Sequence, residues 1–369
     1  MKRPTYKIAT LLMIVSIIIF GCSNKETIAE PSEEPEIEYV DSDINEEPSE
    51  ETKEAAAPVY ENIFPLTGLG TNEPIDQRIF AIMINNHPKA RPQSGLHKAD
   101  IVYEILAEGY ITRFLAVYQS ELPEVVGPIR SARDYYIHLS KDLGAIYVAY
   151  GGSPEAFDLL QHRAVTDYIG GIVRKGYADD QFFYRANFRS APHNVYIKEE
   201  NLLKAAEVRN FALSQDVEPF SFSTGNDLTL VSGETAEEVV INYASSYTVN
   251  YKYDGELMAY VRYSNGEKTI DRETETPLRI SNIFIVEAPH KVIDNAGRRD
   301  IKLTGNGKGY LIQRGLVQEV EWENRNGRIV PIKNGEIQSY VPGQTWVNVI
   351  PNKPGLVDTV SFGSSNDKE

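Results

Sequence analysis

The sequence GPIRSARDYY, residues 127–136, places two arginines, Arg130 and Arg133, three positions apart. Ser131 and Asp134 have the spacing of a capping box, which predicts a helix with Ser131 as its N-cap and Asp134 in its third position. Free backbone N–H groups and the helix dipole favour an anion at such a start. The motif therefore predicts an anion-binding site. The alternative is that both arginines only form ion pairs with neighbouring carboxylates.

Three acids follow one another at intervals of four, namely Asp100, Glu104 and Glu108. On a helix they would share one face, and on a strand the last two would still share a face. Paired carboxylates can hydrolyse a glycosidic bond, one as the acid and the other as the base or nucleophile. The alternative is pairing with arginines such as Arg113, or with those of the GPIRSARDYY motif.

Two further segments supply candidate ligand groups. In YGGSPEAF, Gly151 and Gly152 lie between an expected strand and a helix that Ser153 would cap, with Pro154 at its first position. Glycines let a ligand approach the backbone, and α/β proteins bind ligands at such loops. RANFRSAPHN, residues 185–194, supplies the second group, and a tight turn or a solvated loop are the alternatives. The candidate ligand-binding residues are Arg91, Arg113, Arg130, Ser131, Arg133, Gly151, Gly152, Ser153, Arg189, His193 and Asn194.

The sequence lacks the familiar signatures of catalytic and metal sites. It contains no G-x-S-x-G motif and no Walker loop, and its six histidines show no zinc-binding spacing. We therefore expect no cofactor and no metal.

Alternating strands and helices must position the candidate residues. The run RIFAIMIN predicts a buried strand, and IVYEILAE and ITRFLAVYQ predict a strand pair around Gly109-Tyr110. SARDYYIHLSKDL has helical spacing, AIYVAYGG predicts a strand, and an amphipathic helix is expected over 198–213. This order predicts an α+β or α/β domain over residues 61–216.

The pattern changes after this domain. From Leu228 onward, short runs rich in Val, Ile, Tyr and Thr are separated by dipeptides typical of two-residue hairpin turns. These dipeptides are Asp254-Gly255, Asn265-Gly266, Asn326-Gly327 and Asn334-Gly335. We therefore expect a second, mostly β domain over residues 217–365.

The amino terminus has the features of a secretory signal. Lys2, Arg3 and Lys7 precede the apolar run IATLLMIVSIIIFG, which ends at Cys22, the single cysteine of the chain. This run is shorter than the roughly 18 residues expected of a spanning helix. We therefore predict a lipoprotein signal over residues 1–22, with Cys22 as the lipid attachment site.

A strongly acidic segment follows the signal. Residues 23–60 contain 13 acids and 2 bases with few apolar side chains, so they cannot bury enough surface to offset the entropy of ordering. They predict a disordered linker. Of the formal net charge of −16, about −8 remains on residues 61–369, which does not favour nucleic acid as a partner.

Several of these motifs together resemble a known family. MINNHPKARPQSGLHKADIVYEILAEGY, GPIRSARDYY, YGGSPEAF and APHN, with RGLVQEVEW and PGQTW near the end, are similar to the YerB-like lipoproteins of Gram-positive bacteria. The resemblance covers nearly all of residues 62–355. It implies a lipid-anchored envelope protein with two domains of unknown function, and it implies no catalytic residue.

The sequence thus favours a non-enzymatic binding or scaffold protein, anchored on the outer face of the cytoplasmic membrane. Its expected partners are the membrane, through the lipid, and an anionic cell-wall ligand or an acidic segment of an envelope protein. The alternative is a cell-wall-directed hydrolase that uses Glu104, Glu108 or Asp134 with His193. A third interpretation is a structural partner of wall-synthesis proteins, which would need an exposed apolar patch.

Overall fold

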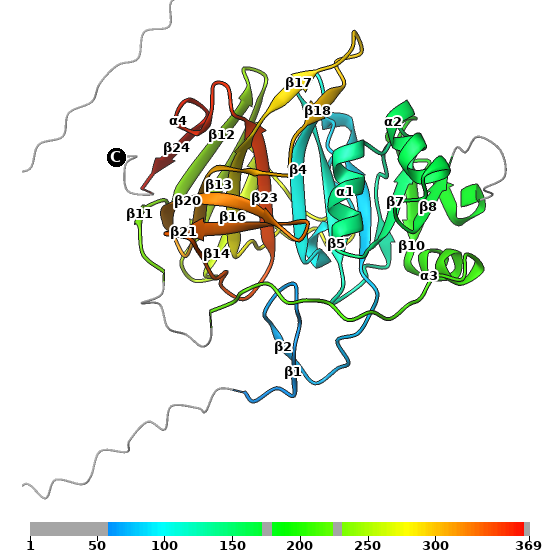
Figure 1. Ribbon diagram of the computed structural model, residues 1–369, viewed down its shortest axis with the longest axis horizontal. Coiled ribbons are helices and arrows are strands. Elements are labelled where there is room, and N and C mark those ends of the chain that lie inside the picture. The colour runs from blue at the N-terminus through cyan, green and yellow to red at the C-terminus, as the bar shows by residue number, and fades with distance from the viewer. Residues whose placement is uncertain (1–57, 172–178, 224–230, 365–369) are drawn as a thin grey trace, which may run out of the picture. The chain divides into compact units, whose positions relative to one another are not determined.

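The computed structural model describes residues 58–171, 179–223 and 231–364 (Figure 1). The predicted signal, its Cys22 and almost all of the predicted linker lie outside these residues. Strands dominate the described part, helices occur mainly in its first half, and the second half is almost entirely β. Among the described residues, no helix combines the length and the apolar character needed to cross a membrane.

A 12-stranded sheet runs through both halves of the chain. Eleven of its strands lie in the order β22-β21-β20-β19-β16-β23-β4-β5-β3-β7-β8. The twelfth strand, β11, pairs with β20 and is not part of this series. The strands of the first half are β3 (Phe80–Asn85), β4 (Ile101–Glu108), β5 (Ile111–Tyr118), β7 (Ile146–Tyr150) and β8 (Tyr168–Gly171). Those of the second half are β11 (Glu234–Thr235), β16 (Asn282–Ala288), β19 (Asn306–Gln313), β20 (Leu316–Arg325), β21 (Arg328–Lys333), β22 (Glu336–Ile337) and β23 (Thr345–Pro351). The two halves join where β23 pairs in parallel with both β16 and β4.

The first half forms most of its elements where the sequence predicts them. The apolar run of β3 is buried along its whole length, and β4 and β5 form the expected antiparallel pair around Gly109-Tyr110. The helices are α1 (Asp134–Asp142), α2 (Pro154–Phe157), which continues into one π-helical turn, η3 (Asp158–His162), and α3 (Glu199–Val208). Ser153 caps α2 as predicted, because its side chain accepts a hydrogen bond from Ala156 N at 3.2 Å. The smaller elements are β1 (Asn62–Ile63), β2 (Gly70–Thr71), η1 (Pro88–Ala90), η2 (Leu96–Lys98), β6 (Val125–Val126), η4 (Asp179–Phe182), β9 (Phe183–Arg185) and β10 (Val195–Lys198).

A five-stranded sheet in the order β15-β14-β13-β12-β24 forms a second layer. Its strands are β12 (Glu238–Ala244), β13 (Tyr247–Asp254), β14 (Ala259–Ser264), β15 (Glu267–Lys268) and β24 (Val360–Gly363). The second half is completed by the ribbon of β17 (His290–Val292) and β18 (Arg299–Ile301) and by a single-turn helix, α4 (Leu356–Thr359). The predicted boundary between residues 216 and 217 falls in the connection that follows α3.

The Asn-Gly dipeptides form two-residue hairpin turns as predicted. Asn265-Gly266, Asn326-Gly327 and Asn334-Gly335 each join two paired strands, and both residues of each turn have positive φ. That conformation matches the twist of the flanking strands. The prediction for Asp254-Gly255 is wrong, because β13 ends at Asp254 and β14 begins only at Ala259, which makes the connection longer.

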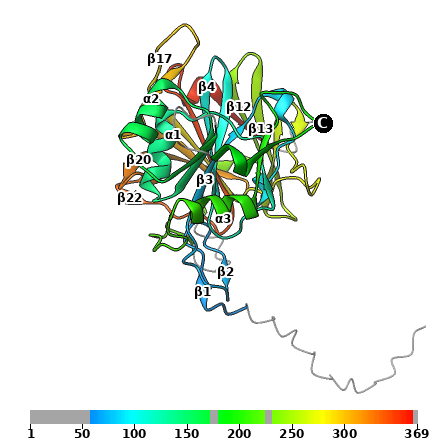
Figure 2. The ribbon, with the colours of Figure 1, turned by 90° about the vertical axis from the view of Figure 1, so that its right-hand side faces the viewer.

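Hydrophobic cores lie on both faces of the large sheet. One core packs the large sheet against the five-stranded sheet and α3, and the other packs it against α1 and α2. Figure 2 shows this arrangement, with α1 and α2 on one side of β3 and with β12 and β13 on the other. Strands buried on both faces have continuous apolar sequences, which explains the composition of β3 and of most of β4.

The predicted capping box at Ser131 is wrong. Helix α1 begins at Asp134 with Arg133 as its N-cap, and the Arg133 side chain makes no capping hydrogen bond. The residues before the helix are extended instead, because Ile129 forms a bridge with Ile84 and Ala132 forms one with Gly152. This pairing with the sheet keeps Ser131 out of the helix.

Candidate anion-binding site

Arg130 lies between the carboxyl ends of two parallel strands, β3 and β7. These strands pair only over Phe80–Ile82 and Ile146–Val148, and the segment 128–132 occupies the space beyond. Arg130 N donates to the carbonyl of Met83 at 2.9 Å, and Tyr150 N donates to the carbonyl of Arg130 at 3.0 Å. The backbone of Arg130 is thus fixed at the edge where parallel sheets commonly bind ligands.

The side chain of Arg130 has no partner among the residues that the structure describes. It is half-buried, and no hydrogen bond or ion pair to its guanidinium occurs there. Burial lowers the pKa of this guanidinium, and the nearby charge of Arg113 lowers it further. A partly desolvated cation without a carboxylate is the arrangement that an incoming anion stabilises.

Two histidine rings lie beside Arg130. His87 and His193 stack with their centroids 4.5 Å apart and an interplanar angle of 24°. Asn85 Nδ2 lies 2.9 Å from His193 Nδ1, and Lys89 N donates to His87 Nδ1 at 3.1 Å. Because each Nδ1 accepts a hydrogen bond, each neutral ring carries its proton on Nε2. The Nε2–H groups are therefore available as donors to a ligand.

The electrostatic environment of both rings is cationic. Burial lowers the pKa of His87, and the charges of Lys89, Arg91 and Arg130 lower it further. Burial also lowers the pKa of His193, followed by the effects of His87, Arg130, Lys89 and Arg189. No carboxylate among the described residues contributes to either shift, so this part of the chain gives the cluster no negative charge of its own. We call His87, Lys89, Arg130 and His193 the basic cluster.

Arg113 and Arg133, unlike Arg130, have a carboxylate partner among the described residues. Both form ion pairs with Glu108, Arg113 at 2.6 Å through Nη2, and both are buried. Arg113 Nη1 also donates to the carbonyl of Ser131 at 2.6 Å, and Arg133 donates to the carbonyl of Ala132. The ion-pair alternative therefore describes these two arginines, and they hold the segment that carries Arg130.

Three other predicted residues have structural contacts. Arg91 donates to the side chain and carbonyl of Asn86 at 3.0 and 2.9 Å, and its guanidinium lies 5.2 Å from the centroid of the Tyr247 ring. Arg189 donates to the carbonyls of Ala90 and Pro92 and thereby holds the loop after β3. Asn194 accepts from Arg185 at 2.9 Å and donates to the carbonyl of Ala186.

The glycine pair supports the backbone around Arg130. Gly151 has a φ of +82°, and a Cβ added there would lie 3.1 Å from Ser131 Oγ. Its carbonyl accepts from Ala132 N at 2.9 Å, and Gly152 forms the bridge with Ala132. Gly151, Gly152 and Ser131 thus bring the arginine segment close to the end of β7, while Ser153 caps the following helix.

The predicted acids all have partners. Glu104 is fully buried and pairs with Arg262 at 2.8 Å, and Glu108 pairs with the two arginines described above. Asp100 accepts from Gln119 N and from Ser120, and burial raises its pKa to about 6 against those hydrogen bonds. Asp134 accepts backbone hydrogen bonds at the start of α1, and burial raises its pKa against them. Glu104 and Glu108 therefore lack the free carboxylate pair that a glycosidase uses.

Sequence reasoning missed two members of the basic cluster, His87 and Lys89. Both lie in the loop HPKARP that directly follows the buried strand β3. Ligand-binding loops commonly follow the carboxyl ends of such strands, so the position of this loop in the sequence could have indicated both residues. The described residues contain no group of three or more His, Cys, Asp or Glu side chains that could hold a metal ion.

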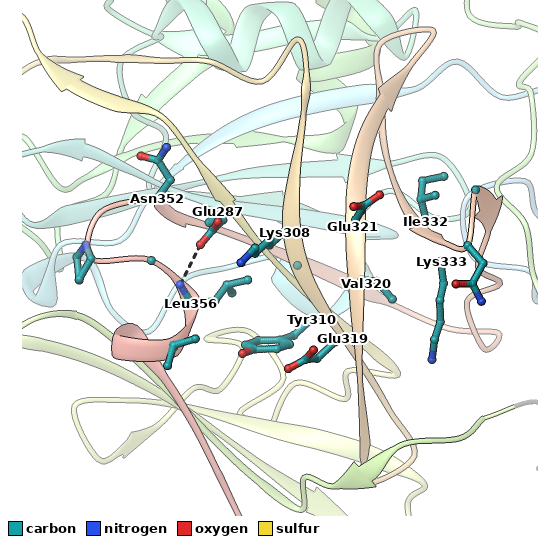
Figure 3. A pocket seen from close by; sticks show the side chains of 16 residues that line it. Glu287, Lys308, Tyr310, Glu319, Val320, Glu321, Ile332, Lys333, Asn352 and Leu356 are labelled. Carbon is teal, nitrogen blue, oxygen red and sulfur yellow. Dashed lines mark hydrogen bonds between the residues drawn. The ribbon is translucent and has the colours of Figure 1, made fainter.

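A separate cleft lies on the second half of the chain. Its volume is about 770 Å³, and Figure 3 shows side chains from β16, β19, β20 and β21 and from the segment before α4. Glu287 accepts from Leu356 N at 3.1 Å at one end of it. Lys308 and Lys333 line it together with Glu319 and Glu321. This mixture of charges selects neither an anion nor a cation, in contrast to the basic cluster.

The fold defines a class of proteins in which two domains, one in each half of the chain, share one large sheet. Residues 66–212 match the description "Protein of unknown function (DUF3048) N-terminal domain", and residues 239–347 match the corresponding C-terminal domain. The chain belongs to this DUF3048 family.

The resemblance to YerB-like lipoproteins is confirmed. A relative from Bacillus subtilis (strain 168) named "Putative lipoprotein YerB" is 46% identical over 292 residues, which cover 78% of this chain and 86% of the relative. The crystal structure of the YerB protein from Bacillus subtilis is similar with a TM-score of 0.74 and 44% identity. That match covers 82% of this chain and 100% of the solved chain.

Proposed function

We propose that this protein is a lipid-anchored, non-enzymatic binding protein of the cell envelope that recognises an anionic ligand at the basic cluster. The observation that carries the proposal is Arg130, a half-buried cation without a carboxylate partner among the described residues. Its neighbours Arg113 and Arg133 are buried and share the carboxylate of Glu108, so they hold the segment that carries Arg130.

The chemistry of the cluster suits an oxyanion such as a phosphate group. A guanidinium offers a planar fork of N–H donors that can bind two oxygens of a phosphate or carboxylate at once. The Nε2–H groups of His87 and His193 add two neutral donors, and Lys89 adds an exposed charge at the rim. Such charge-assisted hydrogen bonds are about twice as strong as neutral ones.

The proposed location rests on the amino terminus and on the relative. Cys22 follows a charged start and a short apolar run, and the Bacillus subtilis relative carries the word lipoprotein in its name. A lipid at Cys22 would hold the folded part near the outer face of the cytoplasmic membrane. Anionic wall polymers and acidic segments of envelope proteins are the ligands within reach.

The test is Arg130→Gln, because Gln keeps much of the length of the side chain and removes its charge. Purified protein is melted with inorganic phosphate, pyrophosphate or glycerol phosphate oligomers. An anion at about a hundred times its dissociation constant stabilises the folded state by roughly 2.7 kcal/mol. We expect this stabilisation in the wild type and its loss in Arg130→Gln, with little change of the melting temperature without anion.

Arg279→Gln is the matched control, since Arg279 is an exposed arginine outside the cluster. It should retain the anion effect. A wild type that none of these anions stabilises, or an Arg130→Gln protein that keeps the full effect, would overturn the proposal.

A further inference from the structure

A cavity of about 270 Å³ opens directly beside the basic cluster. His87 belongs to both, because its ring stacks on His193 and also lines the cavity. The other walls are formed mainly by Pro88, Tyr110, Ile111, Ser246, Tyr247 and Asn265. A ligand bound at the basic cluster would therefore have this cavity next to it.

Both halves of the chain build the cavity. The first half contributes the loop after β3 and the turn between β4 and β5 with Tyr110, and the second half contributes the turns before β13 and before β15. Tyr110 and Ile111 are 62% and 39% exposed, so two largely apolar side chains form its rim. Neither family domain alone contains this cavity.

The polar side chains of the cavity are already engaged with the protein. Asn265 donates to the carbonyl of Ser246 at 3.1 Å and accepts from Thr248 N at 2.8 Å. Arg91 is held by Asn86 and lies over the ring of Tyr247, whose hydroxyl donates to Glu104 at 2.7 Å. With these groups satisfied, and with the Tyr247 ring covered by Arg91 and stacked on Tyr243, the surfaces left for a ligand are mainly Tyr110, Ile111 and Pro88.

We infer that the anion recognised by the basic cluster carries an apolar or aromatic substituent, which occupies this cavity. The ligand class is a phosphate ester of an apolar alcohol, with the phosphoryl group at Arg130 and the histidines and the first part of the alcohol against Tyr110, Ile111 and Pro88. This inference rests on the proposed function and adds the identity of the organic part. The volume is below the roughly 300–1,000 Å³ of sites for drug-sized ligands, so it fits one ring or a short chain.

The experiment compares three probes on the wild type by calorimetry: inorganic phosphate, glycerol 1-phosphate and phenyl phosphate. We expect phenyl phosphate to bind about tenfold more tightly than inorganic phosphate, which corresponds to about 1.4 kcal/mol. Glycerol 1-phosphate should bind little more tightly than inorganic phosphate, because its hydroxyl groups would lose their hydrogen bonds to water at an apolar wall. Vesicles with and without phosphatidic acid then distinguish a lipid source of the ester from a small soluble one.

The variant Tyr110→Ser/Ile111→Ser removes the apolar rim at an exposed hairpin end. It should bring the affinities for phenyl phosphate and inorganic phosphate within about threefold of each other, while the affinity for inorganic phosphate stays unchanged. Val357→Ser, at an apolar residue that is 84% exposed elsewhere, is the control and should keep the tenfold preference.

The two hypotheses fail in different ways. If inorganic phosphate binds through Arg130 but phenyl phosphate gains no affinity, or gains it equally in the Tyr110→Ser/Ile111→Ser variant, the inference is overturned and the proposed function stands. If none of the probes binds, the proposed function fails and the inference with it.

Discussion

Replacing Arg262 by Met should strongly destabilise the whole folded part of the chain. Arg262 and Glu104 are both 0% exposed, and they pair at 2.8 Å between the large sheet and the five-stranded sheet. Arg262 also donates to Ser264 Oγ at 2.7 Å and to Thr269 Oγ1 at 2.9 Å. Burial opposes its charge, but the carboxylate of Glu104 and nearby tyrosine hydroxyls outweigh burial and raise the pKa of Arg262 above its usual range.

The size of the effect follows from the charge that the substitution leaves behind. Glu104 would remain buried with only Asn86, Thr112 and Tyr247 as donors. Breaking a buried pair by removing one partner costs about 3–5 kcal/mol. With an unfolding entropy of about 2.1 cal/mol/K per residue over roughly 300 residues, this loss lowers the melting temperature by about 5–8 °C.

The assay is urea unfolding followed by far-ultraviolet circular dichroism and by tryptophan fluorescence, with a parallel thermal melt. The variant Glu104→Leu/Arg262→Met should recover more than half of the loss, because the buried charge is then absent. Lys252→Met removes one partner of a half-exposed pair, Lys252 and Glu238, and should cost less than Arg262→Met, at about 1 kcal/mol. A loss below 1 kcal/mol for Arg262→Met, or a double variant no better than the single one, would refute the reasoning.

Two further predictions concern the site and the anchor. Since the pKa values of His87 and His193 are lowered below 6.5, the unfolded chain binds more protons, and stability without a ligand should fall as the pH drops through 6.5. A bound anion raises the pKa of both rings again, so the affinity for sulfate should rise from pH 8 to pH 5.5 when it is measured by calorimetry. In the variant His87→Gln/His193→Gln, the affinity for sulfate should not change over this pH range. A flat profile in the wild type would contradict the assigned role of the rings. Radiolabelled palmitate should label the wild-type protein in cells but not Cys22→Ala, and an unlabelled wild type would exclude the lipid anchor.

Local rules account for the parts of the fold that the sequence predicts correctly. The turn at Asn326-Gly327 follows from two adjacent residues that tolerate positive φ, and β3 follows from a short apolar run. Ser131 satisfies the local rule for a helix cap equally well, yet bridges on both sides of it keep the segment extended. Those bridges depend on strands distant in sequence, which a local pattern does not contain.

Local sequence patterns likewise predict only part of the basic cluster. Arg130 and His193 are polar residues in recognisable motifs, and both lie in the basic cluster. His87 enters it by stacking on a ring from a distant loop. The contrast between Arg130 and Arg133 is likewise tertiary, because Glu108 reaches the second arginine and not the first. Residue type and spacing are alike for the two arginines, and only the folded chain separates them.

The position of β23 has a consequence for the order in which the protein can fold. This strand is almost the last of the chain, yet it lies between β4 and β16 and is hydrogen-bonded to both. Until residues 345–351 have joined the sheet, β4 therefore has an unpaired edge. Exposed edges of apolar strands associate readily with other chains. A product truncated shortly before residue 345 should therefore aggregate.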